Sequence, residues 1–79
     1  MKDIIAELEG CFKLEISYMK IGLKREIDFI KRREMADNCI QRLMGAAQFA
    51  NRLGGEFQII ESMFEHYKEE IRTLEENFY

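Results

Sequence analysis

The stretch QFANRLGGEFQII, residues 48–60, places a pair of glycines between two strongly apolar segments. Gly54 can adopt the left-handed backbone conformation that ends a helix, and Gly55 can serve as the N-cap of the next one. Arg52 lies just before the pair and Glu56 just after it, where each charge suits the dipole of its own helix. The stretch therefore predicts a helical hairpin that turns at residues 54–55.

The segments on both sides of this turn have helical periodicity. After the turn, apolar residues recur at alternating intervals of three and four, the heptad pattern of a packed helix: Phe57, Ile60, Phe64, Tyr67, Ile71, Leu74 and Phe78. Before the turn, residues 35–53 are apolar over most of the helix circumference, which is typical of a helix with more than one neighbour. We therefore expect a hairpin of two helices at about 35–53 and 56–78.

Residues 2–31 carry a third apolar stripe at helical spacing, which predicts a long N-terminal helix. The stripe follows an eleven-residue repeat and consists of Ile5, Leu8, Phe12, Ile16, Met19, Leu23, Ile27 and Ile30. Its direction differs from that of the apolar face of residues 35–53, and the change falls in KRREMADN, residues 31–38. The chain either turns there, with Asp37 or Asn38 as a new N-cap, or continues as one helix of about 50 residues.

The predicted N-terminal helix is longer than the arms of the hairpin, about 45 Å against about 33 Å. We therefore expect its apolar stripe to lack full cover within its own chain, and a stripe of that size is too large an apolar patch for a stable monomer. The sequence thus predicts one all-α domain, residues 1–79, that assembles as a dimeric helical bundle. The expected dimer or partner interface consists of Leu8, Phe12, Ile16, Met19, Leu23, Ile27 and Ile30.

The composition is that of a small helical protein. The 79 residues contain no proline and few glycines, which suits long helices, and a chain this short builds only a marginal core. Charged residues throughout the first fifteen argue against a secretory signal, and no apolar run reaches the length of a membrane span, so we expect a cytoplasmic protein. Cys11 and Cys39 form no CxxC motif, and we expect them to be buried as small apolar side chains.

Candidate catalytic and metal-binding groups are few. His66 is the single histidine, and Glu70 would be its neighbour one helical turn later. The Glu-x-x-His pattern of di-iron bundles fails because Met63 stands where the glutamate would be. A stable metal site needs about four ligands, and a phosphate loop needs a lysine and a hydroxyl residue after its glycines. We therefore expect neither an enzyme nor a bound cofactor.

Charge is unevenly distributed along the chain, since residues 20–53 are net basic and the segments on both sides are net acidic. Lys2 and several later lysines would share one narrow face of the N-terminal helix, and two arginines extend this basic row. The candidate anion-binding residues are Lys13, Lys20, Lys24, Lys31, Arg32 and Arg33. Such a row suits the phosphates of nucleic acid or an anionic membrane surface, but equally suits pairing with the acidic last helix.

Helical hairpins and heptads are generic, so the predicted function depends on the surface and not on the fold. We expect a non-catalytic protein–protein interaction module, an adaptor, inhibitor or regulatory subunit, that acts as a homodimer and recognises a protein partner through a helical face. The alternative is a nucleic-acid-associated regulator that uses the lysines of the N-terminal helix.

Overall fold

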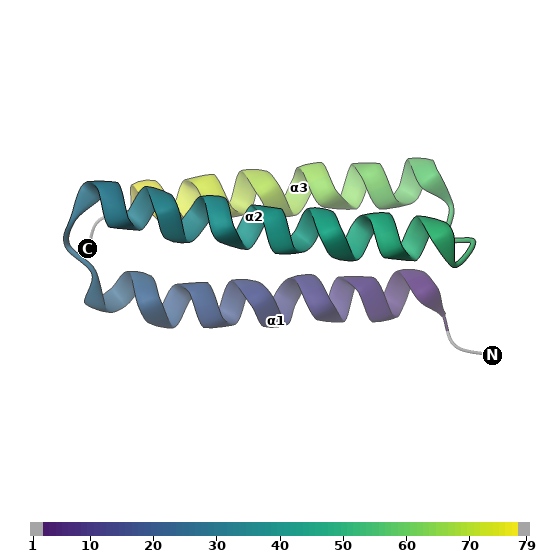
Figure 1. Cartoon of the computed structure of the whole chain (residues 1–79), viewed down its shortest axis with the longest axis horizontal. Coiled ribbons are helices and arrows are strands. Elements are labelled where there is room, and N and C mark those ends of the chain that lie inside the picture. The colour runs from purple at the N-terminus through teal and green to yellow at the C-terminus, as the bar shows by residue number, and fades with distance from the viewer. Residues whose placement is uncertain (1–2, 78–79) are drawn as a thin grey trace.

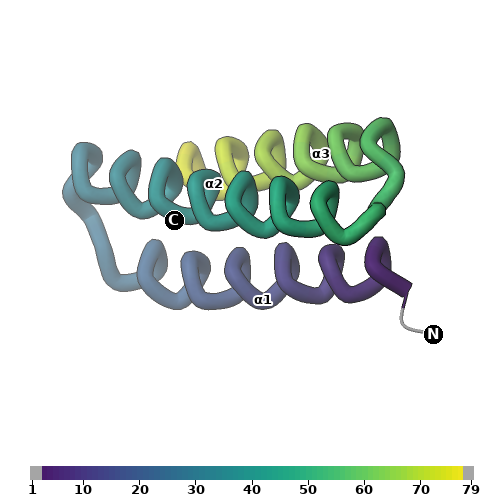
Figure 2. Tube along the Cα trace, turned by 45° about the vertical axis from the view of Figure 1, so that its right-hand side comes forward, coloured from purple at the N-terminus to yellow at the C-terminus, as the bar shows by residue number. Residues whose placement is uncertain are grey.

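The computed structural model describes residues 3–77 and forms three helices over that range: α1 (Ile4–Arg25), α2 (Phe29–Arg52) and α3 (Phe57–Glu76). The three helices lie side by side and alternate in direction (Figures 1 and 2), so that the bundle measures 42 × 19 × 15 Å. Each helix contacts the other two. The all-α class is confirmed, and residues 3–77 contain no strand.

The turn at the glycine pair is also confirmed. Gly54 has a φ of +94°, and its N–H donates a hydrogen bond to the carbonyl of Asn51 at 3.2 Å. The N–H of Gly55 donates to the carbonyl of Ala50 at 3.0 Å, which completes a Schellman cap at the end of α2. A Cβ on Gly55 would lie 2.6 Å from Cδ1 of Ile60, so the second glycine permits the close approach of α3.

The start of α3 differs slightly from the expectation. Its N-cap is Glu56 and not Gly55, and the Glu56 side chain makes no capping hydrogen bond. The hairpin arm is therefore held by the Schellman cap before it and by core packing after it.

The break between the first two helices lies earlier in the chain than predicted. Residues 26–28 separate α1 from α2, so both alternatives for residues 31–38, a turn there or an uninterrupted helix, are wrong. Asp28 is the N-cap of α2: its carboxylate accepts hydrogen bonds from the backbone N–H groups of Ile30 at 2.9 Å and Lys31 at 3.4 Å. This short polar side chain starts a new helix without any glycine or proline.

Because α1 ends at Arg25, the three helices have similar lengths of 22, 24 and 20 residues. At a rise of about 1.5 Å per residue they span about 33, 36 and 30 Å. The predicted overhang of the N-terminal helix is therefore wrong, and with it the reason to expect an uncovered apolar stripe.

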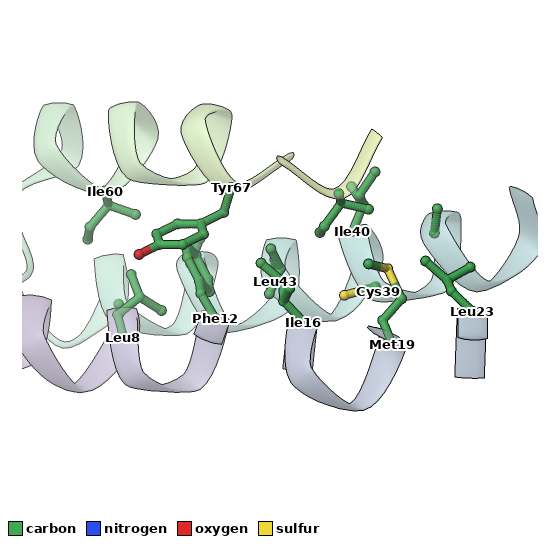
Figure 3. Packing of buried hydrophobic residues seen from close by; sticks show 14 residues of the cluster. Leu8, Phe12, Ile16, Met19, Leu23, Cys39, Ile40, Leu43, Ile60 and Tyr67 are labelled. Atoms are coloured by element: carbon green, nitrogen blue, oxygen red, sulfur yellow. The ribbon is translucent and has the colours of Figure 1, made fainter. Parts of the chain in front are cut away.

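The stripe of α1 forms part of a core that the chain closes by itself. Five members of the predicted interface are at most 6% exposed: Leu8, Phe12, Ile16, Met19 and Leu23. Figure 3 shows them packed against side chains of α2 and α3; the ring centres of Phe12 and Tyr67 are 5.7 Å apart. Of the seven predicted interface residues, Ile27 and Ile30 are the two that remain on the surface.

The described helices also bear on membrane insertion. No helix within residues 3–77 is both long enough and apolar enough to cross a bilayer.

Candidate interaction surfaces

Arg32 is buried near the start of α2 and contacts the ends of α1 and α3. The end of the bundle where α1 and α3 both terminate is on the left in Figure 1. The guanidinium of Arg32 donates hydrogen bonds to the carbonyls of Leu23 at 2.5 Å and Glu26 at 3.0 Å, at the end of α1. It also donates to the carbonyls of Glu75 and Asn77, at 3.2 and 2.9 Å, at the end of α3. The last carbonyls of a helix lack partners within the helix, and a cation suits the dipole there. Arg32 thus caps two helices, and its buried guanidinium is engaged by their carbonyl groups.

Arg33 is engaged as well. It forms an ion pair with the carboxylate of Glu75, whose side chain is 4% exposed. Arg72 approaches the same carboxylate at 3.4 Å and pairs with Asp37 at 2.9 Å. This cluster joins α2 to α3, so the guanidinium of Arg33 serves the fold in the structure.

The four lysines of the predicted anion-binding set are exposed, but the row is divided. Lys13, Lys20 and Lys24 lie on α1, whereas Lys31 lies on α2 because the chain turns between them. Lys2 lies outside the described residues. Within residues 3–77 these four lysines form no ion pair, so the alternative pairing with the acidic last helix is not made there.

Three large apolar side chains cluster at the turn between α1 and α2. Ile27, Phe29 and Ile30 are 66–81% exposed, and we call them the turn patch. Their backbone is held firmly, because Asp28 caps α2 and its own N–H donates to Oε1 of Glu26 at 3.0 Å. The turn patch therefore presents apolar groups on a rigid support.

A groove of about 360 Å³ adjoins the turn patch. Leu23, Ile27 and Leu74 contribute apolar walls, and Lys20 and Lys24 stand at the same groove. Glu26, Arg32 and Asn77 complete the lining, so the groove is apolar with a charged margin in which basic side chains outnumber the one acidic side chain.

A second apolar surface runs along α1. Cys11, Leu14, Tyr18 and Ile21 are exposed, the last three by more than half, and we call these four residues the outer seam. They are spaced at intervals of three, four and three, so they share one face of the helix. The sequence analysis did not identify this surface, because it placed the interface on the main apolar stripe and expected Cys11 to be buried.

The reactive side chains of the chain are dispersed. Cys39 is fully buried, and burial raises the pKa of its thiol to about 11, so the thiol stays protonated at neutral pH. Cys11 is exposed, so its expected burial is wrong. The ring of His66 packs edge-on against Tyr67, with centres 5.1 Å apart. Residues 3–77 contain no group of three or more potential ligands that could hold a metal ion.

No known family, curated protein or solved structure matches this chain. The turn patch and the outer seam therefore have to be compared by their exposure, charge and shape. The turn patch contains the three most exposed large apolar side chains of residues 3–77. The outer seam is the longest row of exposed apolar side chains on one helix face within the same residues. Other exposed apolar side chains, Phe49, Leu53 and Phe57, lie near the turn between α2 and α3.

Proposed function

We propose that this protein is a non-catalytic protein–protein interaction module, an adaptor, inhibitor or regulatory subunit, that acts as a homodimer. The observation that carries the proposal is the turn patch, in which Ile27, Phe29 and Ile30 remain exposed although the core is closed. A small group of large apolar side chains on a rigid support is typical of the residues that dominate binding energy at protein interfaces. We assign the partner-binding role to this patch.

The neighbouring groove supports a particular kind of partner. Its apolar walls include Leu23, Ile27 and Leu74, and the ammonium groups of Lys20 and Lys24 form no ion pair with the described residues. An amphipathic helix with apolar side chains on one face and flanking aspartate or glutamate residues would satisfy both properties. The partner proposed here is such a helix in another protein.

The test compares immobilised wild-type protein with the double variant Ile27→Ser and Ile30→Ser in extract of the native cell. Ile59→Ser, which changes an exposed isoleucine on α3, is the matched control. We expect a protein that the wild type and the control retain and the double variant loses. After purification, that protein should bind the double variant at least about tenfold more weakly in calorimetry. Absence of any protein whose retention depends on Ile27 and Ile30 would contradict the proposal.

A nucleic-acid-associated regulator is the second candidate function. It is favoured by Lys13, Lys20 and Lys24, which are exposed on one helix without an ion pair in the described part of the chain. Fluorescence anisotropy with a random DNA duplex tests it. Binding that falls steeply between low and moderate salt, and is lost in Lys20→Gln with Lys24→Gln, would support this function. Absence of binding at low salt would exclude it.

A further inference from the structure

We infer that the outer seam of α1 is the homodimer interface, and that α1 pairs there in antiparallel orientation with α1 of a second copy. The inference rests on the proposed homodimer and names the face and the orientation that form it. The seam is available for this pairing because the core residues of α1 already have partners within the chain.

The seam and the core occupy different sides of α1. Extended by one heptad position at each end, the seam reads Glu7, Cys11, Leu14, Tyr18, Ile21 and Arg25, with intervals of four, three, four, three and four. At 100° per residue its mean direction lies about 140° from that of the core stripe. A second helix can therefore approach the seam without displacing α2 or α3.

The seam is symmetric about its middle, which lies at the level of Ile16. When two copies run in opposite directions about a two-fold axis at that level, Leu14 of each copy faces Tyr18 of the other. Cys11 then faces Ile21 of the second copy. All the exposed apolar residues of the seam thus obtain apolar partners from the same surface of an identical chain, as a two-fold interface requires.

Charge selects the antiparallel orientation. The seam ends in the acidic Glu7 on one side and the basic Arg25 on the other, and both are exposed. Antiparallel pairing brings Glu7 of each copy to Arg25 of the other, so opposite charges meet at both ends of the seam. Parallel pairing would instead place Glu7 against Glu7 and Arg25 against Arg25, which is repulsive.

The size of the seam sets the expected affinity. A standard stable interface covers about 800 Å² on each partner, whereas the seam is one helix wide and about 33 Å long. Since the chain closes its core without help, the dimer is not obligate for folding. We expect a dissociation constant of about 10–100 µM, and therefore a monomer that still folds when the dimer is broken.

Charge reversal combined with sedimentation equilibrium at about 100 µM protein tests the orientation. Glu7→Arg and Arg25→Glu, each alone, should raise the dissociation constant about tenfold, because like charges then face each other at both ends of the seam. The double variant Glu7→Arg with Arg25→Glu should restore the wild-type constant. A parallel dimer keeps like charges opposed in all four proteins, so it predicts no such pattern. Far-UV circular dichroism confirms that each variant is folded.

Disulfide capture gives an independent reading if a charge variant fails to fold. Under mild oxidation, Ile21→Cys should form a dimer linked between Cys11 and the new cysteine at position 21 of the other chain. The wild type should form no such dimer, because the two Cys11 residues would lie about 15 Å apart along the antiparallel pair. A Cys11–Cys11 dimer of the wild type would overturn the inference.

The outcomes separate this inference from the proposed function. A wild-type dimer that is indifferent to the charge reversals and to Ile21→Cys would overturn the seam assignment but leave the proposed homodimer intact. A wild-type monomer at about 100 µM would overturn both the seam and the homodimer. Binding of another protein through Ile27 and Ile30 is measured separately and does not depend on either result.

Discussion

Arg32 is the residue whose role differs most from its residue type. Arginine side chains mostly lie on protein surfaces, whereas Arg32 is only 4% exposed. Its guanidinium donates hydrogen bonds to carbonyl groups at the ends of two helices. A positional signal was present in the sequence, because Arg32 lies one helical turn before Ala36 on the buried face of α2. The general preference of arginine for surfaces and anions obscured it. Gly54, by contrast, was predicted correctly because few other residues tolerate its backbone conformation.

The planar guanidinium of Arg32 is required because it donates hydrogen bonds to several carbonyl groups at once. We expect Arg32→Lys to lower the free energy of unfolding by about 2 kcal/mol, since a single ammonium group cannot reach both helix ends. Urea denaturation measures the loss. The same change at the exposed Arg52, Arg52→Lys, should stay within about 0.5 kcal/mol. Equal effects at the two positions would show that Arg32 does not hold the helix ends together.

At the scale of elements, periodicity predicted three helical segments, but it placed one boundary wrongly. Residues 26–28 contain neither glycine nor proline, and Ile27 and Ile30 continue the spacing of the α1 stripe across the break. The one local signal was Asp28, a good N-cap residue in a chain with several acidic residues. A break that depends on one capping side chain and on the buried Arg32 is difficult to predict, because the second contribution is tertiary.

The two ends of α2 differ in a way that glycine substitutions can measure. We expect Gly54→Ala to destabilise the protein by about 1 kcal/mol, because alanine is strained at a φ of +94°. Gly45→Ala should stabilise it by up to about 1 kcal/mol, since Gly45 is exposed within α2 and nothing lies within 4 Å of an added Cβ. Thermal unfolding of the two variants should therefore shift in opposite directions. A stabilising Gly54→Ala would contradict the Schellman turn.

At the scale of the whole molecule, the main error of the sequence prediction follows from that boundary. An N-terminal helix of thirty residues would overhang the hairpin and need a second chain, whereas α1 of 22 residues is covered by α2 and α3. Apolar periodicity shows that a helix face is buried, but it does not show whether the cover comes from the same chain. For this reason the predicted interface divides into five core residues and the exposed pair of Ile27 and Ile30. The position of α1 in the bundle separates its two apolar faces, because the core stripe is buried and the outer seam is exposed.

The central claim is that α1 turns its Phe12–Leu23 stripe inward within one chain and its outer seam outward. Neighbouring residues test it most directly, because Tyr18 belongs to the seam and Met19 to the core. Tyr18→Gln and Met19→Gln are compared by urea denaturation, followed by far-UV circular dichroism, at low micromolar concentration. We predict that Tyr18→Gln unfolds cooperatively within about 1 kcal/mol of the wild type, whereas Met19→Gln loses about 3 kcal/mol because its amide is buried without a partner. Equal losses, or a larger loss for Tyr18→Gln, would contradict this arrangement.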